Sequence, residues 1–219
     1  MGRIDAPQHA PQVRWLATAA LAGLSVFALV CVAVQFLRPD MDWRHAPMSF
    51  YLLGPHGVWL QAAYFALGCA LLLLAAGYYR ALHPQARSAA PGLLFAMAAM
   101  GLFVTAIADS NLPQRAPTLQ GWLHGVAAQT AFLCVTTAML LQSWRLRADP
   151  RWRSRFARAF LLAAAAFAAV WVLALWREAP RGLAQKGAIA LIVAWLALAA
   201  AWLRSRTGGR GTFLPPPPP

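Results

Sequence analysis

Residues 15–37, WLATAALAGLSVFALVCVAVQFL, form an apolar run without a charged side chain. A helix that crosses the hydrocarbon core of a bilayer needs about 20 consecutive, mostly apolar residues. Further runs of this kind follow at residues 57–79, 91–108, 121–144, 159–176 and 187–203. The sequence therefore predicts an all-α fold, an integral membrane bundle of six transmembrane helices.

The composition excludes ordinary soluble proteins. Of all residues, 60% are hydrophobic and 11% are charged, whereas about 25% of the residues of a soluble domain are charged. The net charge of +13 could indicate nucleic-acid binding, but the arginines lie between the apolar runs, as is typical of membrane proteins. We therefore expect membrane lipids, and no nucleic acid, as partners, while a protein partner or an oligomer stays open.

The basic residues predict how the chain is oriented. With six spans, the termini and the second and fourth loops share one side of the membrane. That side holds 13 basic residues and the other side holds 6: Arg3, Arg14, Arg80, Arg87, Arg145, Arg147, Arg151, Arg153, Arg155, Arg158, Arg204, Arg206 and Arg210 against Arg38, Arg44, Arg115, Arg177, Arg181 and Lys186. Because cytoplasmic loops carry the excess of Lys and Arg, both termini are expected in the cytoplasm of a bacterial cytoplasmic (inner) membrane protein.

These spans divide the chain into three parts. Residues 1–14 are expected to form a cytoplasmic N-terminal segment, and residues 15–204 the transmembrane domain. Residues 205–219 contain several glycines and end in five prolines, a composition that is typical of disordered segments. They are predicted to be a disordered Gly/Pro-rich cytoplasmic tail.

Polar groups suited to chemistry gather on the predicted outer side. His56 follows Pro55 and comes directly before the second apolar run, so it should lie at the positive end of a helix dipole, which disfavours its protonated form. Asp109 closes the third run and faces a negative helix end, which favours a compensating partner: Arg115, His124 or Lys186. The alternative is a solvated loop aspartate.

The start of the fourth run adds two candidates. Thr118 could cap the helix or contact Asp109. His124 lies about one turn inside the predicted span, and an ionisable group in that position is a candidate functional residue. The alternative for His124 is a hydrogen bond to a neighbouring group without any further role.

The order and spacing of several short motifs resemble one known family. The motifs are Ser49-x-Tyr51 with Gly54 and Gly57, Ala108-Asp109, Thr118-x-x-Gly121-x-x-His124, and the stretch from Gly182 to Lys186. Together they resemble the bacterial and archaeal domain-of-unknown-function 998 family, over nearly the whole chain. The resemblance implies a six-helix membrane protein and supplies no established reaction.

Four kinds of function remain open, and the sequence favours the first. A polar site at the outer face would bind a lipid headgroup, a small polar ligand or a partner protein, with these candidates: Ser49, Tyr51, His56, Asp109, Thr118, His124 and Lys186. In the second, a membrane-embedded lipid hydrolase, His56, Asp109 and His124 would bind zinc as the cofactor. In the third, a proton-coupled transporter, Asp109 and His124 would titrate, and haem binding by the two histidines is a further alternative.

Overall fold

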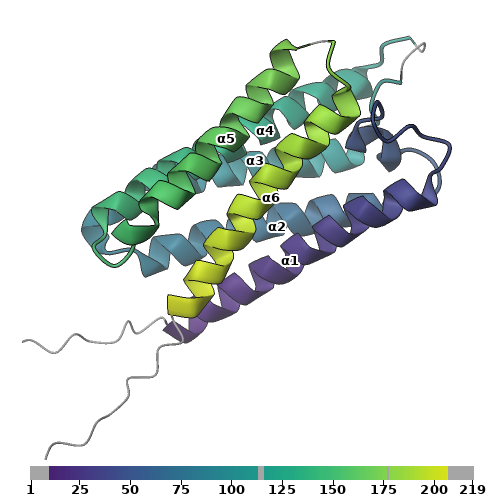
Figure 1. The fold of residues 1–219 in the computed structure, drawn as a ribbon. Coiled ribbons are helices and arrows are strands. Elements are labelled where there is room, and N and C mark those ends of the chain that lie inside the picture. The colour runs from purple at the N-terminus through teal and green to yellow at the C-terminus, as the bar shows by residue number, and fades with distance from the viewer. Residues whose placement is uncertain (1–9, 113–115, 177, 207–219) are drawn as a thin grey trace, which may run out of the picture.

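The computed structural model describes residues 10–112, 116–176 and 178–206, and all the regular secondary structure in these ranges is helical. Six long helices follow one another (Figure 1): α1 (Ala10–Leu37), α2 (Gly57–Ala81), α3 (Ala89–Ile107), α4 (Leu119–Ala148), α5 (Phe156–Leu175) and α6 (Arg181–Arg206). Each is long and apolar enough to cross a membrane. The six-span helical fold expected from the sequence is therefore present.

Several helices extend beyond the apolar runs that predicted them. Helix α1 begins at Ala10 and includes Arg14, α4 continues past Trp144 to Ala148, and α6 begins at Arg181. Hydropathy marks only the part of a helix that lies in hydrocarbon, whereas backbone hydrogen bonds continue through polar residues. The predicted tail lies outside the described residues from position 207 onward, and so do residues 1–9.

The helices form a closed ring in which neighbours in sequence are neighbours in space. Each helix packs against the next one along the chain, and α1 packs against α6 to complete the ring. The start of α1 and the end of α6 lie together at one end of the bundle (Figure 1). We call this the terminal end, and it also carries residues 82–88 and 149–155. The opposite end, which we call the distal end, carries residues 38–56, 108–112, 116–118, 176 and 178–180.

Small residues allow close contact between α1, α2, α5 and α6. Fully buried alanines lie on these helices, for example Ala17, Ala63, Ala163 and Ala200. Close approach of this kind stabilises helix pairs in lipid, where burial of apolar surface gives little driving force. Two hydrogen bonds add to it, because the Tyr78 hydroxyl donates to the Ala199 carbonyl and the Trp195 ring nitrogen donates to the Ala159 carbonyl, each over 2.9 Å.

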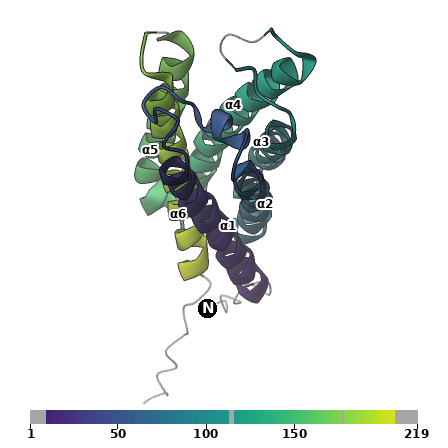
Figure 2. The ribbon, with the colours of Figure 1, turned by 90° about the vertical axis from the view of Figure 1, so that its right-hand side faces the viewer.

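Helices α4 and α5 are held together by aromatic contacts toward the terminal end. The ring of Trp144 packs against Phe156 and Phe160, with centroid distances of 5.8 Å and 6.1 Å. Figure 2 views the bundle from its distal end, with α5 and α6 on one side, α3 and α4 on the other, and the 38–56 segment between them. The short helix η1 (Met48–Leu52) belongs to that segment.

Candidate functional site

The 38–56 segment is folded back by a buried arginine. Arg38 is only 8% exposed, and it donates to both carboxylate oxygens of Asp40 over 2.8 Å and to the Leu53 carbonyl over 2.7 Å. The hydrogen bonds from this guanidinium lower the pKa of Asp40. Because Arg38 joins the end of α1 to residue 53, the intervening loop is closed on itself.

The first turns of α6 hold the same segment from the other side. The Lys186 ammonium donates to the carbonyls of Trp43 and Ala46, the latter over 2.9 Å. The Gln185 side-chain oxygen accepts the Met48 backbone N–H over 2.7 Å. Gly182 packs so closely against the Ala46 carbonyl that a Cβ there would lie 2.6 Å from it. In the contacts that the structure describes, Lys186 therefore holds the 38–56 segment against α6.

The chain between α3 and α4 is attached by the motif that opens α4. Thr118 caps the helix by accepting the Gly121 N–H over 3.0 Å, and its own N–H and hydroxyl donate to the Asn111 side-chain oxygen over 3.1 Å each. Gly121 leaves room for the Asn111 amide, which would collide with a Cβ at that position. One turn later, Nδ1 of buried His124 lies 2.8 Å from the Ala108 carbonyl, so Nδ1 must carry the hydrogen.

These attachments surround a cavity of about 930 Å³ that receives side chains from all six helices and from η1. Its deep part is apolar, formed among others by Phe27, Leu67, Leu71, Val135, Ile192 and Leu196. Its distal part is polar, with Ser49, Ser110, Asn111, His124, Arg181 and Gln185. The cavity is thus amphipathic along the axis of the bundle.

Part of the cavity wall faces outward between the distal halves of α4 and α5. Leu133 and Trp171 line the cavity and are 40% and 45% exposed. Gln129 and Ala174 line it as well and are exposed too. Since these positions belong to spans that a bilayer would surround, the cavity is accessible from the side of the bundle.

Of the candidates expected from the sequence, two contribute to this cavity. Ser49 and His124 line it. Tyr51 lies next to Ser49 but is fully buried, its hydroxyl has no hydrogen-bond partner among the described residues, and burial raises its pKa. The Lys186 ammonium lies 5.5 Å from the centre of the Tyr51 ring.

His56 and Asp109 are not brought to the cavity. His56 precedes α2 in the left-handed conformation, with φ 65°, and its exposed ring packs on Trp59 at 5.0 Å. Asp109 is exposed, and no described residue forms a hydrogen bond or an ion pair with its carboxylate; Arg115 lies outside the described ranges. His124 contacts the carbonyl of Ala108 instead of the neighbouring carboxylate.

The expected zinc ligands are consequently separate from one another. Within the described parts of the chain, no group of three His, Cys, Asp or Glu side chains is placed to hold a metal ion. The physical reason is that α3 ends at Ile107, which leaves Asp109 in a polar loop where water solvates its charge. An extended loop carries a side chain away from the helix face that sequence spacing would suggest.

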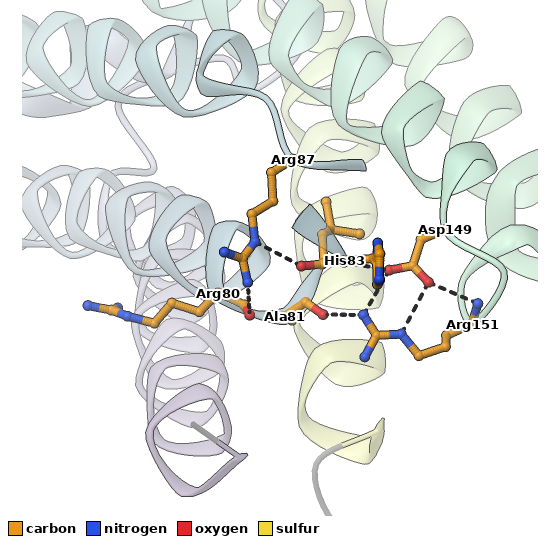
Figure 3. Close-up of polar contacts among 7 residues, drawn as sticks. Arg80, Ala81, His83, Arg87, Asp149 and Arg151 are labelled. Carbon is orange, nitrogen blue, oxygen red and sulfur yellow. Dashed lines mark hydrogen bonds and ion pairs between the residues drawn. The ribbon is translucent and has the colours of Figure 1, made fainter. Parts of the chain in front are cut away.

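A second polar cluster, at the terminal end, was not apparent from the sequence. Asp149 is fully buried and accepts the His83 N–H over 2.9 Å and the Arg151 side chain over 2.9 and 3.1 Å (Figure 3). Arg151 also donates to the Ala81 carbonyl over 2.8 Å. Burial acts to raise the pKa of Asp149, but the hydrogen bonds from Arg151 and from backbone N–H groups outweigh it and lower the pKa.

Arg145 extends this connection between the 82–88 loop and α4. Its guanidinium donates to the carbonyls of Ala86, Gln85 and Arg87, over 2.7, 3.2 and 3.3 Å. Arg145 and Arg151, and likewise Arg155, which donates to the Trp202 carbonyl, therefore make tertiary contacts as well as carrying positive charge. Charge patterning alone could not distinguish these two roles.

Comparison with known proteins yields one match. A family model described as "Protein of unknown function (DUF998)" matches residues 21–202. No curated protein and no solved structure shows significant similarity to the chain. The matched range contains all the residues that line the cavity, the 38–56 segment, and the polar cluster around Asp149.

Proposed function

Because the chain belongs to the family Protein of unknown function (DUF998) and has the six apolar helices of a multi-pass membrane protein, we propose that it binds one amphiphilic, lipid-like molecule in its central cavity. The observation that carries the proposal is the amphipathic cavity itself. A hydrocarbon chain would lie among the deep apolar side chains, and a polar headgroup would lie at the distal end.

The size of the cavity supports a small amphiphile. Its volume of about 930 Å³ lies near the upper end of the roughly 300–1,000 Å³ that is typical of small-molecule sites. Such sites are mostly apolar, with a few polar groups that orient the ligand. Ser49, His124 and Gln185 are polar groups of this kind, since they line only the distal part.

The lateral exposure of the cavity supports entry from the membrane. Leu133 and Trp171 are both cavity-lining and exposed. A lipid that moves between the distal halves of α4 and α5 would keep its hydrocarbon chain out of water throughout. A water-soluble ligand would not need this apolar side opening.

Binding is favoured over catalysis because the candidate catalytic groups do not converge. The Ala108 carbonyl orients His124 through Nδ1, but Asp109 and His56, the groups that could act with it, are exposed away from the cavity lining. A general base or a nucleophile needs a second group within hydrogen-bond reach to orient or activate it. His124 therefore lines the cavity as a side chain that the Ala108 carbonyl holds in place.

The charge distribution supports an orientation for the bound lipid. Exposed arginines cluster at the terminal end, among them Arg80, Arg147, Arg153 and Arg158. By the positive-inside rule, this end lies in the cytoplasm of a bacterial inner membrane, and so do both chain termini. The polar end of the cavity would then lie at the outer leaflet.

Lipid retention in a cavity-filling variant tests the proposal. No heavy atom lies within 4 Å of the position of a Cβ at Gly125, which lines the cavity, so Gly125→Phe should place a ring in the cavity without a backbone clash. Gly187→Phe is the matched control, because Gly187 is equally open but does not line the cavity. Native mass spectrometry of the detergent-purified proteins counts the lipids that remain bound.

We expect one lipid on the wild type and on Gly187→Phe, and none on Gly125→Phe. Equal lipid retention by all three proteins, with all of them folded, would contradict binding in this cavity.

A further inference from the structure

We infer that the distal end of the cavity recognises an anionic headgroup, a phosphate or a carboxylate. The inference rests on the proposed function, because it specifies the headgroup of the amphiphile bound there. It comes from the hydrogen-bonding capacity that the protein leaves unused around the cavity, together with the charges that line it.

Gln185 presents a donor to the cavity. A backbone N–H can only donate, so the side-chain atom of Gln185 that lies 2.7 Å from the Met48 nitrogen must be the amide oxygen. The other end of the amide, the Nε2 amino group, has no hydrogen-bond partner among the described residues, and Gln185 lines the cavity. An amino group offers two N–H donors and no acceptor.

Asn111 presents a donor for the same reason. Its side-chain oxygen accepts the Thr118 backbone N–H and the Thr118 hydroxyl, each over 3.1 Å. The backbone N–H again identifies the oxygen, and the Nδ2 amino group has no partner among the described residues. Asn111 lines the cavity from the α3–α4 connection, whereas Gln185 lines it from α6.

The charged group of the lining has the same preference. Arg181, the first residue of α6, lines the cavity, and no aspartate or glutamate is among the described residues that line it. Two acidic side chains of the 38–56 segment are already paired, Asp40 with Arg38 and Asp42 with His45. Arg181 is exposed and lines the cavity, and no acidic side chain of the described residues, Glu178 included, forms an ion pair with it.

An acceptor-only headgroup matches this set of groups. Phosphate and carboxylate oxygens accept hydrogen bonds from amino groups and from guanidinium, and charge-assisted bonds of this type are the stronger ones. A phosphocholine headgroup also has phosphate oxygens that can accept hydrogen bonds from the two amides, but its quaternary ammonium cancels the net charge and would place a cation near Arg181. The cavity should therefore bind the anionic member of a pair of lipids that share the same acyl chains.

Separate titrations with two such lipids test the inference. Purified full-length protein in detergent is titrated with phosphatidic acid or phosphatidylcholine of identical chains, and native mass spectrometry gives the bound fractions. Inorganic phosphate is titrated in a third arm, which distinguishes a lipid headgroup from a free anion. The variants are Arg181→Gln, Arg181→Lys, and the control Arg44→Gln, which removes an exposed distal arginine that does not line the cavity.

We expect phosphatidic acid to bind the wild type, Arg181→Lys and Arg44→Gln roughly tenfold more tightly than phosphatidylcholine, and the difference to disappear in Arg181→Gln. The cavity-filling variant Gly125→Phe is included in the same titrations. If the wild type binds the two lipids with equal affinity and Gly125→Phe binds neither, the headgroup preference is overturned and the proposed function stands. Persistence of the preference in folded Arg181→Gln would also overturn it.

Failure of the proposed function itself has a different signature. Neither lipid would then bind, or both would bind Gly125→Phe as well as they bind the wild type. If inorganic phosphate alone binds, and Arg181→Gln abolishes that binding while no lipid is retained, the anion preference stands and the amphiphile is excluded.

Discussion

Asp149 shows how one charged side chain can connect two loops of a membrane bundle. Its carboxylate is fully buried, yet it accepts hydrogen bonds from His83 in one loop and from Arg151 in the other. A buried charge without such partners is strongly unfavourable, and removing one partner of a buried pair is more damaging than the pair is stabilising. Single substitutions at this position should therefore be informative.

We predict that Asp149→Asn lowers the free energy of unfolding by about 1.5–3 kcal/mol, the value of hydrogen bonds to a charged group. The carboxylate has a lowered pKa in the folded protein, so its stabilisation is present above its pKa in the unfolded chain, about 3.9. That stabilisation is lost as the pH falls through the folded-state pKa. Thermal unfolding in detergent at a series of pH values measures both effects.

Asp109→Asn is the matched control, because Asp109 is exposed and has no partner among the described residues. It should leave the unfolding temperature and its pH dependence close to those of the wild type. An Asp149→Asn protein with the same acid sensitivity as the wild type would refute the role of this carboxylate.

Thr118 combines a helix cap with a loop contact. We predict that Thr118→Ala lowers stability by about 1 kcal/mol or more, since the loss of a cap costs this much and the contact with Asn111 is lost as well. Thr118→Ser should restore most of the stability. Thr130→Ala is the control within the same helix, because its hydroxyl only donates to the Val126 carbonyl one turn earlier; an equal loss in this control would contradict the capping role. Denaturant unfolding in detergent provides the comparison.

At the scale of elements, the helix starts of α4 and α6 perform the same task. Each attaches a distal segment of the chain. Helix α4 holds the end of the α3–α4 connection through Thr118 and His124, and α6 holds the 38–56 segment through Gln185 and Lys186. Most of their partners are backbone groups. These polar side chains therefore hold chain segments in place, whereas the sequence suggested that Thr118, His124 and Lys186 form a polar binding site. Only His124 and Gln185 of these four also line the cavity.

We predict that Lys186→Met releases the 43–48 segment from α6. The ammonium donates to the carbonyls of Trp43 and Ala46, and methionine keeps the length of the side chain but cannot donate. Hydrogen exchange of residues 43–48 should become at least severalfold faster, while exchange in the helices stays unchanged. Arg181→Gln removes a charge from the same helix start without these two contacts; if it accelerates exchange equally, the effect is one of charge and the assigned role is wrong.

At the scale of the whole molecule, closure of the ring creates the cavity. Side chains from α1 through α6 meet at the cavity because α1 packs against α6 while α4 and α5 leave an exposed strip between their distal halves. In a bilayer, exposed apolar residues face lipid, so a cavity that opens through them communicates with the membrane. The orientation of the bundle in the membrane therefore decides which leaflet the polar end of the cavity lies in.

The orientation can be measured with two single-cysteine variants. In a background with the native cysteines Cys31, Cys69 and Cys134 replaced, Arg44→Cys places an exposed thiol at the distal end and Arg153→Cys places one at the terminal end. We predict that a membrane-impermeant maleimide labels Arg44→Cys in intact cells and labels Arg153→Cys only after permeabilisation, because the positive-inside rule favours a cytoplasmic location for the arginine-rich terminal end. The reverse pattern would invert the proposed topology.

The sequence singled out only some of the polar residues that line the cavity. Ser49 and His124 line the cavity, whereas His56 and Asp109 lie exposed outside its lining. Titratable residues attract attention in an apolar chain, but their sequence positions do not say which way a loop turns. No sequence pattern marked three further polar residues of the lining as candidates. They are Asn111 and Gln185, which have uncharged amides, and Arg181 at the start of α6.

The sequence by itself determined six membrane-spanning helices and a strongly asymmetric charge distribution, because hydropathy and charge are local properties that a bilayer reads along the chain. The tertiary structure alone decided that these helices close into a ring, that the ring encloses a cavity, and that Asp149 is buried while Asp109 is not. Those outcomes depend on which side chains and backbone groups from distant segments meet, and such pairings are set by packing and hydrogen bonding across the whole bundle.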